Sequence, residues 1–213
     1  MRICFLSGVL GLAAWMQAGP PPKQPARPGD GAAIFNGKDL SGWEGDTSLW
    51  RVEEGAIVGR SPGIQRNEFL ATTREFGDFE LRLSFQLEGG SGNTGIQFRS
   101  KRIPGHVSGY QADIGQQYWG CLYDEARRNR VLVQAPPALD RVLRKEGWND
   151  YVIRAEGERI QLWLNGLQTV EYRETDPAID RSGILALQIH SGGPMVVRFK
   201  ELRLRNLSRP GAR

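Results

Sequence analysis

Residues 79–87 read Phe-Glu-Leu-Arg-Leu-Ser-Phe-Gln-Leu, so apolar and polar residues alternate without a break. Side chains leave a β-strand on alternate faces, and this segment therefore predicts a strand with one buried face and one polar face. Similar runs predict further strands at 50–53, 56–58, 95–100, 110–114, 131–135, 148–155, 160–164, 167–170, 184–190 and 195–204. In the last run the apolar phase switches between Phe199 and Leu202, which predicts a β-bulge.

Turn residues join these runs into hairpins. Asn165-Gly166 separates two apolar segments, and Asn-Gly is typical of a two-residue hairpin turn because both positions take φ > 0. Glu54-Gly55 predicts a second hairpin. A helical period is weak, and only 124–130 and 138–145 are expected to form short helical pieces. The expected fold class is all-β, an antiparallel two-sheet jelly-roll sandwich.

Composition narrows the class of protein. Hydrophobic residues make up 39% and charged residues 24% of the 213 residues, which supports a folded core and excludes disorder throughout. The net charge is only +4, and basic residues alternate with acidic ones as on solvated strand faces. No nucleic-acid partner is therefore expected. After the N-terminus no apolar run reaches the roughly 18 residues that a transmembrane helix needs.

The N-terminus predicts export. One arginine, a short apolar run and small residues form the pattern of a signal peptide over 1–18, although a buried first strand or helix is the alternative. A Pro-rich linker is expected at 19–31, a single domain at 32–207 and a tail at 208–213. The expected location is secreted or periplasmic. Cleavage would leave Cys121 as the only cysteine, so no internal disulfide is expected.

Three predicted strands carry polar residues opposite an apolar face. Alternation places the polar side chains on one side of a sheet if these strands are neighbours. The residues are Gln97, Arg99, Gln111, Asp113, Gln188 and His190. An ordinary solvent-exposed face is the alternative. Other exposed strand positions carry Glu, Arg, Lys and Ser, whereas these carry mainly amides, so we favour a binding groove.

Aromatic and acidic residues gather between two of these strands, namely Tyr110, Tyr118, Trp119, Tyr123, Asp124 and Glu125. Aromatic faces stack on the C–H patches of sugar rings, and amides and carboxylates bond to hydroxyls. The pattern therefore predicts a carbohydrate ligand. The alternative is that Trp119 and Tyr123 belong to the core.

Familiar catalytic motifs are missing from the sequence. It has no Gly-x-Ser-x-Gly, no phosphate-binding loop, no His-Glu-x-x-His and no cysteine pair for zinc. Two histidines are too few for a histidine-built metal site. Asp113, His190 and a glutamine could still provide some of the ligands of a divalent ion, so the cofactor stays open.

An ordered set of segments resembles the 3-keto-disaccharide hydrolase domain family over about 34–206. The segments are 35–43, 50–59, 76–81, 92–99, 109–114, 120–124, 148–149, 164–166, 184–190 and 197–204. The resemblance implies a concanavalin A-like jelly roll, export, and action on sugars oxidised at C3. Family members often have Glu at the position of Gln111 and Gln at that of Asp113, so the acid has moved along this strand.

The implied reaction is elimination followed by hydration. A C3 ketone acidifies the C2 proton, so one base can form an enolate that expels the C1 oxygen, and water then adds. Asp113 or His190 is expected as the base, Arg99 as the charge at the enolate, and Asp124 or Glu125 as the acid. Retaining chemistry with two carboxylates is disfavoured because residues 111–116 hold only one.

A non-catalytic carbohydrate-binding module is the alternative function, since the same aromatics and amides would serve it. The predicted substrate-binding residues are Gln97, Tyr110, Gln111, Trp119, Tyr123, Asp124, Glu125 and Gln188. His190 follows a strand and precedes a Gly-rich loop, and histidine can accept a proton near neutral pH. We expect His190 and Asp113 to share one groove and to contact a single hexose.

Overall fold

The structure of the protein is a computed structural model that describes residues 31–207. The expected signal peptide and tail lie outside the described residues, as does all of the expected linker except Gly31. In the described part of the chain, no helix is long and apolar enough to cross a membrane.

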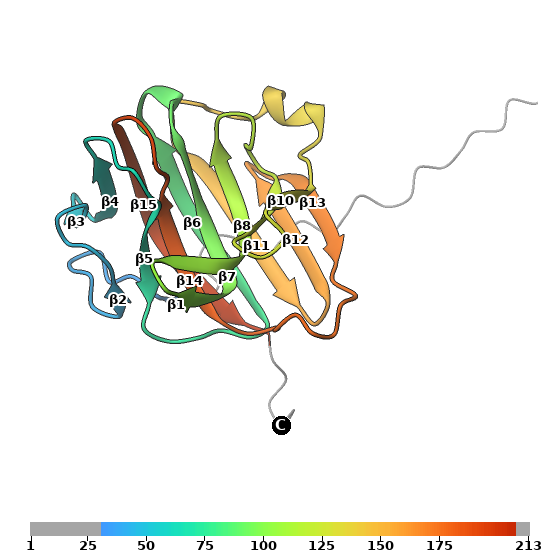
Figure 1. Ribbon diagram of the computed structural model, residues 1–213. Helices are drawn as coiled ribbons and strands as arrows, with labels where there is room; N and C mark the ends of the chain where they lie inside the picture. The colour runs from blue at the N-terminus through green and yellow to red at the C-terminus, as the bar shows by residue number, and fades with distance from the viewer. Residues whose placement is uncertain (1–30, 208–213) are drawn as a thin grey trace, which may run out of the picture.

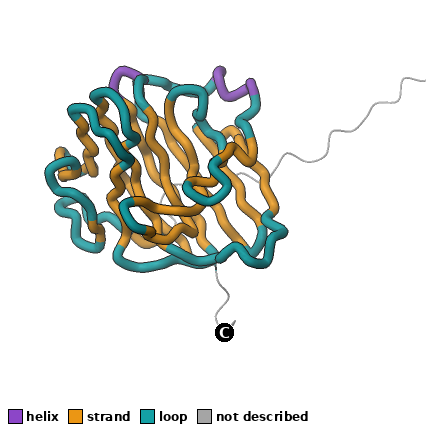
Figure 2. Tube along the Cα trace, in the orientation of Figure 1, coloured by secondary structure: helices purple, strands orange, loops and turns teal. Residues whose placement is uncertain are grey.

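Two antiparallel sheets face one another, with loops at both ends (Figures 1 and 2). Sheet A has the order β13(Leu167–Arg173), β12(Arg159–Leu164), β11(Asn149–Glu156), β6(Phe79–Leu87), β15(Met195–Asn206), β4(Ala56–Ser61), β3(Trp50–Glu53), and β1(Ala32–Ala33) pairs with β15. Sheet B has the order β10(Arg130–Val133), β9(Leu122–Glu125), β8(His106–Gly115), β7(Asn93–Ile103), β14(Ile184–Ile189), β5(Glu68–Thr72), β2(Trp43–Glu44). The predicted jelly-roll sandwich is confirmed.

The inward faces of both sheets form one apolar core. Phe85 of sheet A is fully buried, stacks on Trp119 at 6.3 Å between ring centroids, and contacts the ring of Tyr151 at 5.7 Å. Burial of such rings supplies most of the driving force for bringing the sheets together. Because Cys121 is a free, buried thiol, packing rather than a disulfide stabilises the sandwich.

Most predicted strands match the structure. The strand predicted at 79–87 is β6, and both predicted hairpins form, as β3–β4 and β12–β13. The predicted bulge appears as a register shift between Lys200 and Arg203 of β15, where Glu201 has φ 56°. The 138–145 prediction overlaps a short 3-10 helix, η2(Pro137–Arg141).

The helical prediction for 124–130 is wrong. Asp124 and Glu125 end strand β9, and Arg130 begins β10. The chain turns between these strands, with Ala126 and Asn129 at positive φ and the Ala126 amide donating to Asn129 Oδ1 at 2.9 Å. Because a side chain satisfies the turn backbone, the helical propensity of the arginines in this segment is overridden.

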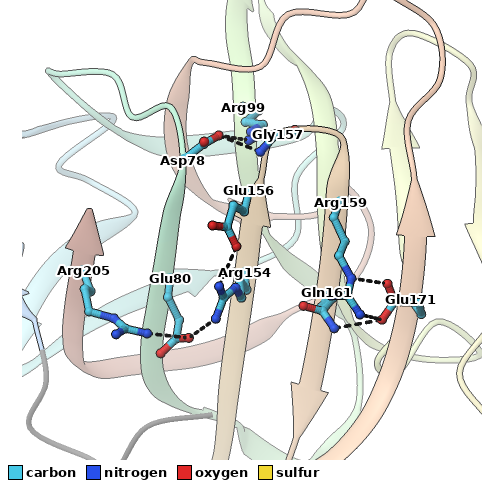
Figure 3. Close-up of polar contacts among 10 residues, drawn as sticks. All are labelled: Asp78, Glu80, Arg99, Arg154, Glu156, Gly157, Arg159, Gln161, Glu171 and Arg205. Carbon is cyan, nitrogen blue, oxygen red and sulfur yellow. Dashed lines mark hydrogen bonds and ion pairs between the residues drawn. The ribbon is translucent and has the colours of Figure 1, made fainter. Parts of the chain in front are cut away.

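The outer face of sheet A carries ion pairs between neighbouring strands (Figure 3). Glu80 is almost completely buried there among three guanidinium groups, with Arg82 at 2.8 Å, Arg205 at 3.2 Å and Arg154 at 3.6 Å. The alternating charges of the sequence thus neutralise one another across this face.

The β7–β8 hairpin folds back over the outer face of sheet B (Figure 1). The pairing of β7 with β8 shifts register between Phe98 and Lys101, where Arg99 takes φ 45°. Beyond this bulge, Val107 packs in a small apolar cluster that lies outside the main core, together with Phe69, Ala71, Ile184 and Ala186. The hairpin therefore partly covers the face on which the polar strand residues lie.

Candidate functional site

Three glutamines form a continuous row of side-chain hydrogen bonds on the outer face of sheet B. Gln97 Nε2 donates to Gln111 Oε1 at 2.8 Å, and Gln111 Nε2 donates to Gln188 Oε1 at 3.2 Å. We call these three residues the amide row. Their strands β7, β8 and β14 are neighbours in the sheet, which is the condition under which alternation places all three side chains on one face.

The row is continuous because Gly95 has no side chain. Gln111 lies on β8 and Gln188 on β14, so a bond between them must cross β7. Gly95 of β7 pairs with Asp113, next to the crossing point. A Cβ at Gly95 would stand 2.6 Å from Cγ of Gln111, which is closer than real Cβ contacts. The bare backbone at this position thus provides the path.

The two ends of the amide row differ. At one end Ser100 Oγ lies 2.9 Å from both Gln97 Oε1 and the carbonyl of Phe98, and its single proton serves one of them at a time. From Gln97 onward, each bond of the row runs from Nε2 of one amide to Oε1 of the next. At the other end Gln188 Nε2 is buried and has no hydrogen-bond partner in the described part of the chain. A buried unsatisfied donor is unfavourable in a folded protein.

Asp113 lies beside the amide row and is only 3% exposed. Asn93 Nδ2 donates to its Oδ1 at 3.4 Å. Burial raises the pKa of the Asp113 carboxyl to about 8, against the hydrogen bonds from Gln111 and Asn93, which lower it. The nearby Glu125 carboxylate raises this pKa further. The result is a carboxyl that exchanges its proton close to neutral pH.

Glu125 is the second carboxylate of this face. Its Oε1 accepts from Asn67 Nδ2 at 3.4 Å and lies 3.4 Å from His106 Nε2. Burial raises the pKa of Glu125, and the two histidines, His106 and His190, oppose that shift. Its side chain keeps 14% exposure, so Glu125 lies nearer to solvent than Asp113.

The bond between Glu125 and Asn67 spans the face of the sheet. Glu125 belongs to β9 and Asn67 immediately precedes β5, and three strands separate β9 from β5 in sheet B. Such a contact can form only over the outer face. His106, which approaches Glu125 from the hairpin, packs its ring on Phe69 at 5.2 Å between centroids, so these groups gather over the outer face.

His190 lies at the end of β14, on the same side as these groups. Its backbone amide donates to the carbonyl of Asn93 at 3.3 Å, and its Nδ1 lies 2.7 Å from the carbonyl of Ser191. His190 lowers the pKa of Glu125, and Glu125 in turn raises the pKa of Asp113. His190 and Asp113 thus lie on the same face of sheet B, and their contact with one hexose stays a prediction.

Arg99 lies apart from this group. Its guanidinium donates to Asp78 at 2.7 Å and to the carbonyls of Gly157 at 2.7 Å and Gly77 at 3.3 Å. These partners lie at the end of the sandwich where β6 begins. Since Arg99 is four residues beyond Gly95, it stands about 13 Å along the strand from Asp113. The bulge at Arg99 breaks the alternation on which its predicted placement was based.

Three other predicted residues point toward the space between the sheets. Tyr110 is stacked on Phe98 at 5.6 Å and its hydroxyl donates to Glu174. Trp119 is in the core. Asp124 is fully buried and pairs with Arg127 at 2.8 Å and Arg128 at 3.1 Å. None of the three lies on the face that carries the amide row.

Tyr123 does lie on that face, because it pairs with Gln111 across β8 and β9. Its ring meets that of Tyr118 edge to face at 6.1 Å. Asn67, Asn93 and His106 complete the surroundings and were not expected from the sequence. Asn93 follows a Gly-rich loop and His106 sits at a hairpin tip, so only the folded-back hairpin and the strand order bring them here.

A pocket of about 220 Å³ adjoins the face at the hairpin tip and is lined in part by Asn67, Phe69, Arg102 and His106. Among residues 31–207, no group of three or more His, Cys, Asp or Glu is arranged to hold a metal ion. This face offers two carboxyls for proton transfer, with amides and histidines around them.

Fold and site together define a concanavalin A-like jelly-roll sandwich with a polar site on the outer face of one sheet. Residues 31–205 match the family described as the 3-keto-alpha-glucoside-1,2-lyase-like domain, and the chain belongs to this family. The family places it among carbohydrate-active proteins. No curated protein matches the chain.

Solved structures resemble the chain in fold. A candidate glycosyl hydrolase from Parabacteroides distasonis ATCC 8503 is 18% identical with a TM-score of 0.61, covering 82% of this chain and 93% of that one. The carbohydrate-binding module CBM66 from Bacillus subtilis is 16% identical with a TM-score of 0.61, covering 78% and 96%. A Bacillus subtilis protein with a galectin-like fold is 11% identical with a TM-score of 0.59, covering 78% and 90%. At these identities the likeness concerns the fold alone.

Proposed function

We propose that this protein cleaves the glycosidic bond of 3-keto glycosides, including 3-keto-disaccharides, by elimination across C1 and C2. The observation that carries the proposal is the buried Asp113 carboxyl, whose pKa of about 8 suits it to proton transfer near neutral pH. Family membership supports the substrate class. Export through a signal peptide at 1–18 would place the reaction in the periplasm or outside the cell.

Asp113 is the proposed base. An ordinary aspartate is too weak a base for a carbon acid, and desolvation is what strengthens it. Asp113 takes the proton from C2, and the electrons of the C2–H bond form the C2=C3 double bond of an enolate, with the negative charge on the C3 oxygen. His190 is the second candidate for this role, because it lies beside Asn93, which holds Asp113.

Glu125 is the proposed acid. Burial raises the pKa of Glu125, which favours its acid form, and its partial exposure places it where a leaving group can depart. The enolate re-forms the C3 carbonyl, C1 and C2 become doubly bonded, and the C1–O bond breaks as Glu125 protonates the departing oxygen. The products are an alcohol and a 1,2-unsaturated 3-keto sugar. Addition of water across that double bond gives net hydrolysis.

Binding of a hexose requires the face to open. Asp113 and the amide row are buried in the chain without ligand, beneath the contact between Glu125 and Asn67. That contact is long at 3.4 Å and joins two side chains rather than backbone, so a sugar hydroxyl can replace either partner. We place the sugar ring between Asp113 and Glu125, with Tyr123 at its side.

A non-catalytic carbohydrate-binding module is the second candidate. The observation in its favour is the fold shared with CBM66, together with the row of amides, which bond to hydroxyls as well as to a ketone. A binding module has no need of a buried carboxyl with a raised pKa, because such a group destabilises the folded state without improving contact with hydroxyls.

Incubation with a 3-keto-disaccharide distinguishes the two functions. We expect release of free monosaccharide and, transiently, of a product with enone absorbance. Asp113→Asn should lose about 10²-fold or more of the turnover while keeping its affinity for the substrate. Binding without release in the wild type would establish the module instead. Full turnover in both Asp113→Asn and His190→Ala would exclude the proposed base.

A further inference from the structure

The sequence predicted that Gln188 binds substrate, and the proposed reaction suggests a more specific role for it, as the hydrogen-bond donor to the enolate. The enolate needs a hydrogen-bond donor at the C3 oxygen. Arg99, the donor expected from the sequence, is held at the end of the sandwich by Asp78 and Gly157. Within residues 31–207, neither Asp113 nor the amide row has an ion pair or a hydrogen bond with an arginine or a lysine. A side-chain amide of the site is then the candidate donor.

Within the described segment, the amide row leaves one amide nitrogen without a hydrogen-bond partner, that of Gln188. The bonds of the row determine that this atom is the nitrogen and not the oxygen of Gln188. Gln188 Oε1 is already engaged by Gln111 Nε2, so the atom of Gln188 that stays available is Nε2. Gln111 cannot turn over without losing both bonds of the row, because its Nε2 donates to Gln188 and its Oε1 accepts from Gln97. The orientation of Gln188 is thus imposed from the far end of the row.

Orientation and polarisation favour a developing negative charge. Each amide in the row donates in the same direction, from Gln97 through Gln111 to Gln188. Hydrogen bonds in such a chain strengthen one another, and burial removes the competition from water. A donor that is already oriented needs no reorganisation when charge develops on its acceptor.

We propose that Gln188 Nε2 donates to the C3 oxygen of the sugar and stabilises the enolate, which makes Gln188 a catalytic residue and Gln111 and Gln97 its positioning residues. This inference rests on the proposed function. It also gives the site a preference for a ketone at C3, because Gln188 offers a donor and no acceptor there. A hydroxyl at C3 could accept from Gln188 Nε2, but its own O–H would find no acceptor on Gln188.

Gln188→Met tests the inference, because methionine keeps the length of the side chain and removes the donor. Two rates are measured: cleavage of a 3-keto-disaccharide, and exchange of the C2 proton for deuterium in D₂O, which reports on the enolate itself. We expect both to fall by about 10²- to 10³-fold with KM changed less than about threefold. Gln86→Met, the same change on the opposite sheet, should leave both rates unaltered.

The positioning residues have a separate readout. Gln111→Met interrupts the row and should lower the exchange rate, whereas Gln111→Glu keeps an acceptor for Gln97 but loses the donor to Gln188, and should not rescue it. In Gln97→Glu the carboxylate can still accept from Ser100, but it cannot donate to Gln111, so Gln111 would have to donate to it instead. If this variant lowers the rate of C2-proton exchange at unchanged thermal stability, then the orientation of the amides matters and not only their packing.

A measurement on the wild type covers the case in which Gln188→Met fails to fold. The side-chain amide of Gln188 is followed by ¹⁵N–¹H NMR as a methyl 3-keto-glucoside is added, and a downfield proton shift is expected at saturation. No shift at saturation overturns the inference. Wild-type turnover with an unimpaired Gln188→Met also overturns it while the proposed function stands. A wild type that neither exchanges nor cleaves overturns both.

Discussion

Gln111 crosses strand β7 directly over the backbone of Gly95, and a Cβ at Gly95 would stand only 2.6 Å from its Cγ. This close approach connects the β8 side of the site to Gln188 on β14. A single absent side chain therefore determines whether the amide row is continuous, and the position can be tested without touching any group that meets the substrate.

Gly95→Ala should displace Gln111 and break its bond to Gln188. The new methyl group meets Cγ, Cδ and Nε2 of the Gln111 side chain rather than backbone, so the fold should survive with a lowered melting temperature. Turnover of a 3-keto-disaccharide should fall at least about tenfold. Gly193→Ala is the matched control, since nothing lies within 4 Å of a Cβ there. Equal activity of the two variants would show that the row has no role.

Asp113→Asn should stabilise the protein at neutral pH. An unfolded aspartate releases its proton near about pH 4, whereas the folded carboxyl keeps it to about pH 8. The folded state binds more protons in this interval, so stability falls as the pH rises through it. Asparagine removes that dependence and should raise the melting temperature at pH 7 by at least about 3 °C. Calorimetry from pH 4 to pH 8 measures both effects, and parallel curves for the two proteins would contradict the burial of a protonated carboxyl.

The pH–rate profile follows from the same carboxyl. A base must be deprotonated to act and the proposed acid Glu125 must be protonated, so kcat/KM should rise with pH as Asp113 loses its proton and fall where Glu125 has lost its own. Loss of the rising limb in Asp113→Asn would identify Asp113 as the base. A limb that persists in Asp113→Asn and disappears in His190→Ala would transfer the role to His190.

Arg99→Met should affect stability and not catalysis. The guanidinium is buried and its loss leaves Asp78 and two carbonyls with fewer donors, at about 3 kcal/mol, or roughly 6–12 °C in melting temperature. The kcat of the folded protein should stay within about twofold of wild type. Arg66→Met, at a side chain that is 77% exposed, should change neither quantity. A large drop in kcat in Arg99→Met, with the melting temperature unchanged, would show that Arg99 acts in catalysis after all.

Substitution of Tyr110 should affect stability, whereas substitution of Tyr123 should affect substrate binding. Tyr110→Phe removes the hydroxyl that donates to Glu174, which keeps Arg128 at 2.8 Å, so about 1 kcal/mol of stability is lost and KM is unchanged. Tyr123→Ala should raise KM by about tenfold, because its ring lies on the face of the amide row. Steady-state kinetics with both variants would contradict this placement if Tyr110→Phe alone changed KM.

Local pattern was sufficient for much of the fold. Uninterrupted alternation in 79–87, the Asn165-Gly166 turn and the phase switch near Glu201 each reflect interactions between residues close in the chain, and all three appear in the structure. Alternation likewise placed Gln97, Gln111 and Gln188 on one face. It also placed Arg99 there, because a bulge that flips a single residue leaves no trace in the pattern.

By itself, the sequence determined the strands, the all-β class, the family and the polar face with Asp113. The tertiary structure alone decided which side chains surround that carboxyl. Asn67, His106 and Glu125 come together because the β7–β8 hairpin folds back and Glu125 of β9 reaches Asn67 beside β5. The pKa of Asp113 is raised by burial, which only the packed structure creates. Such contacts join residues distant in sequence, and desolvation is a property of the packed site rather than of any residue type.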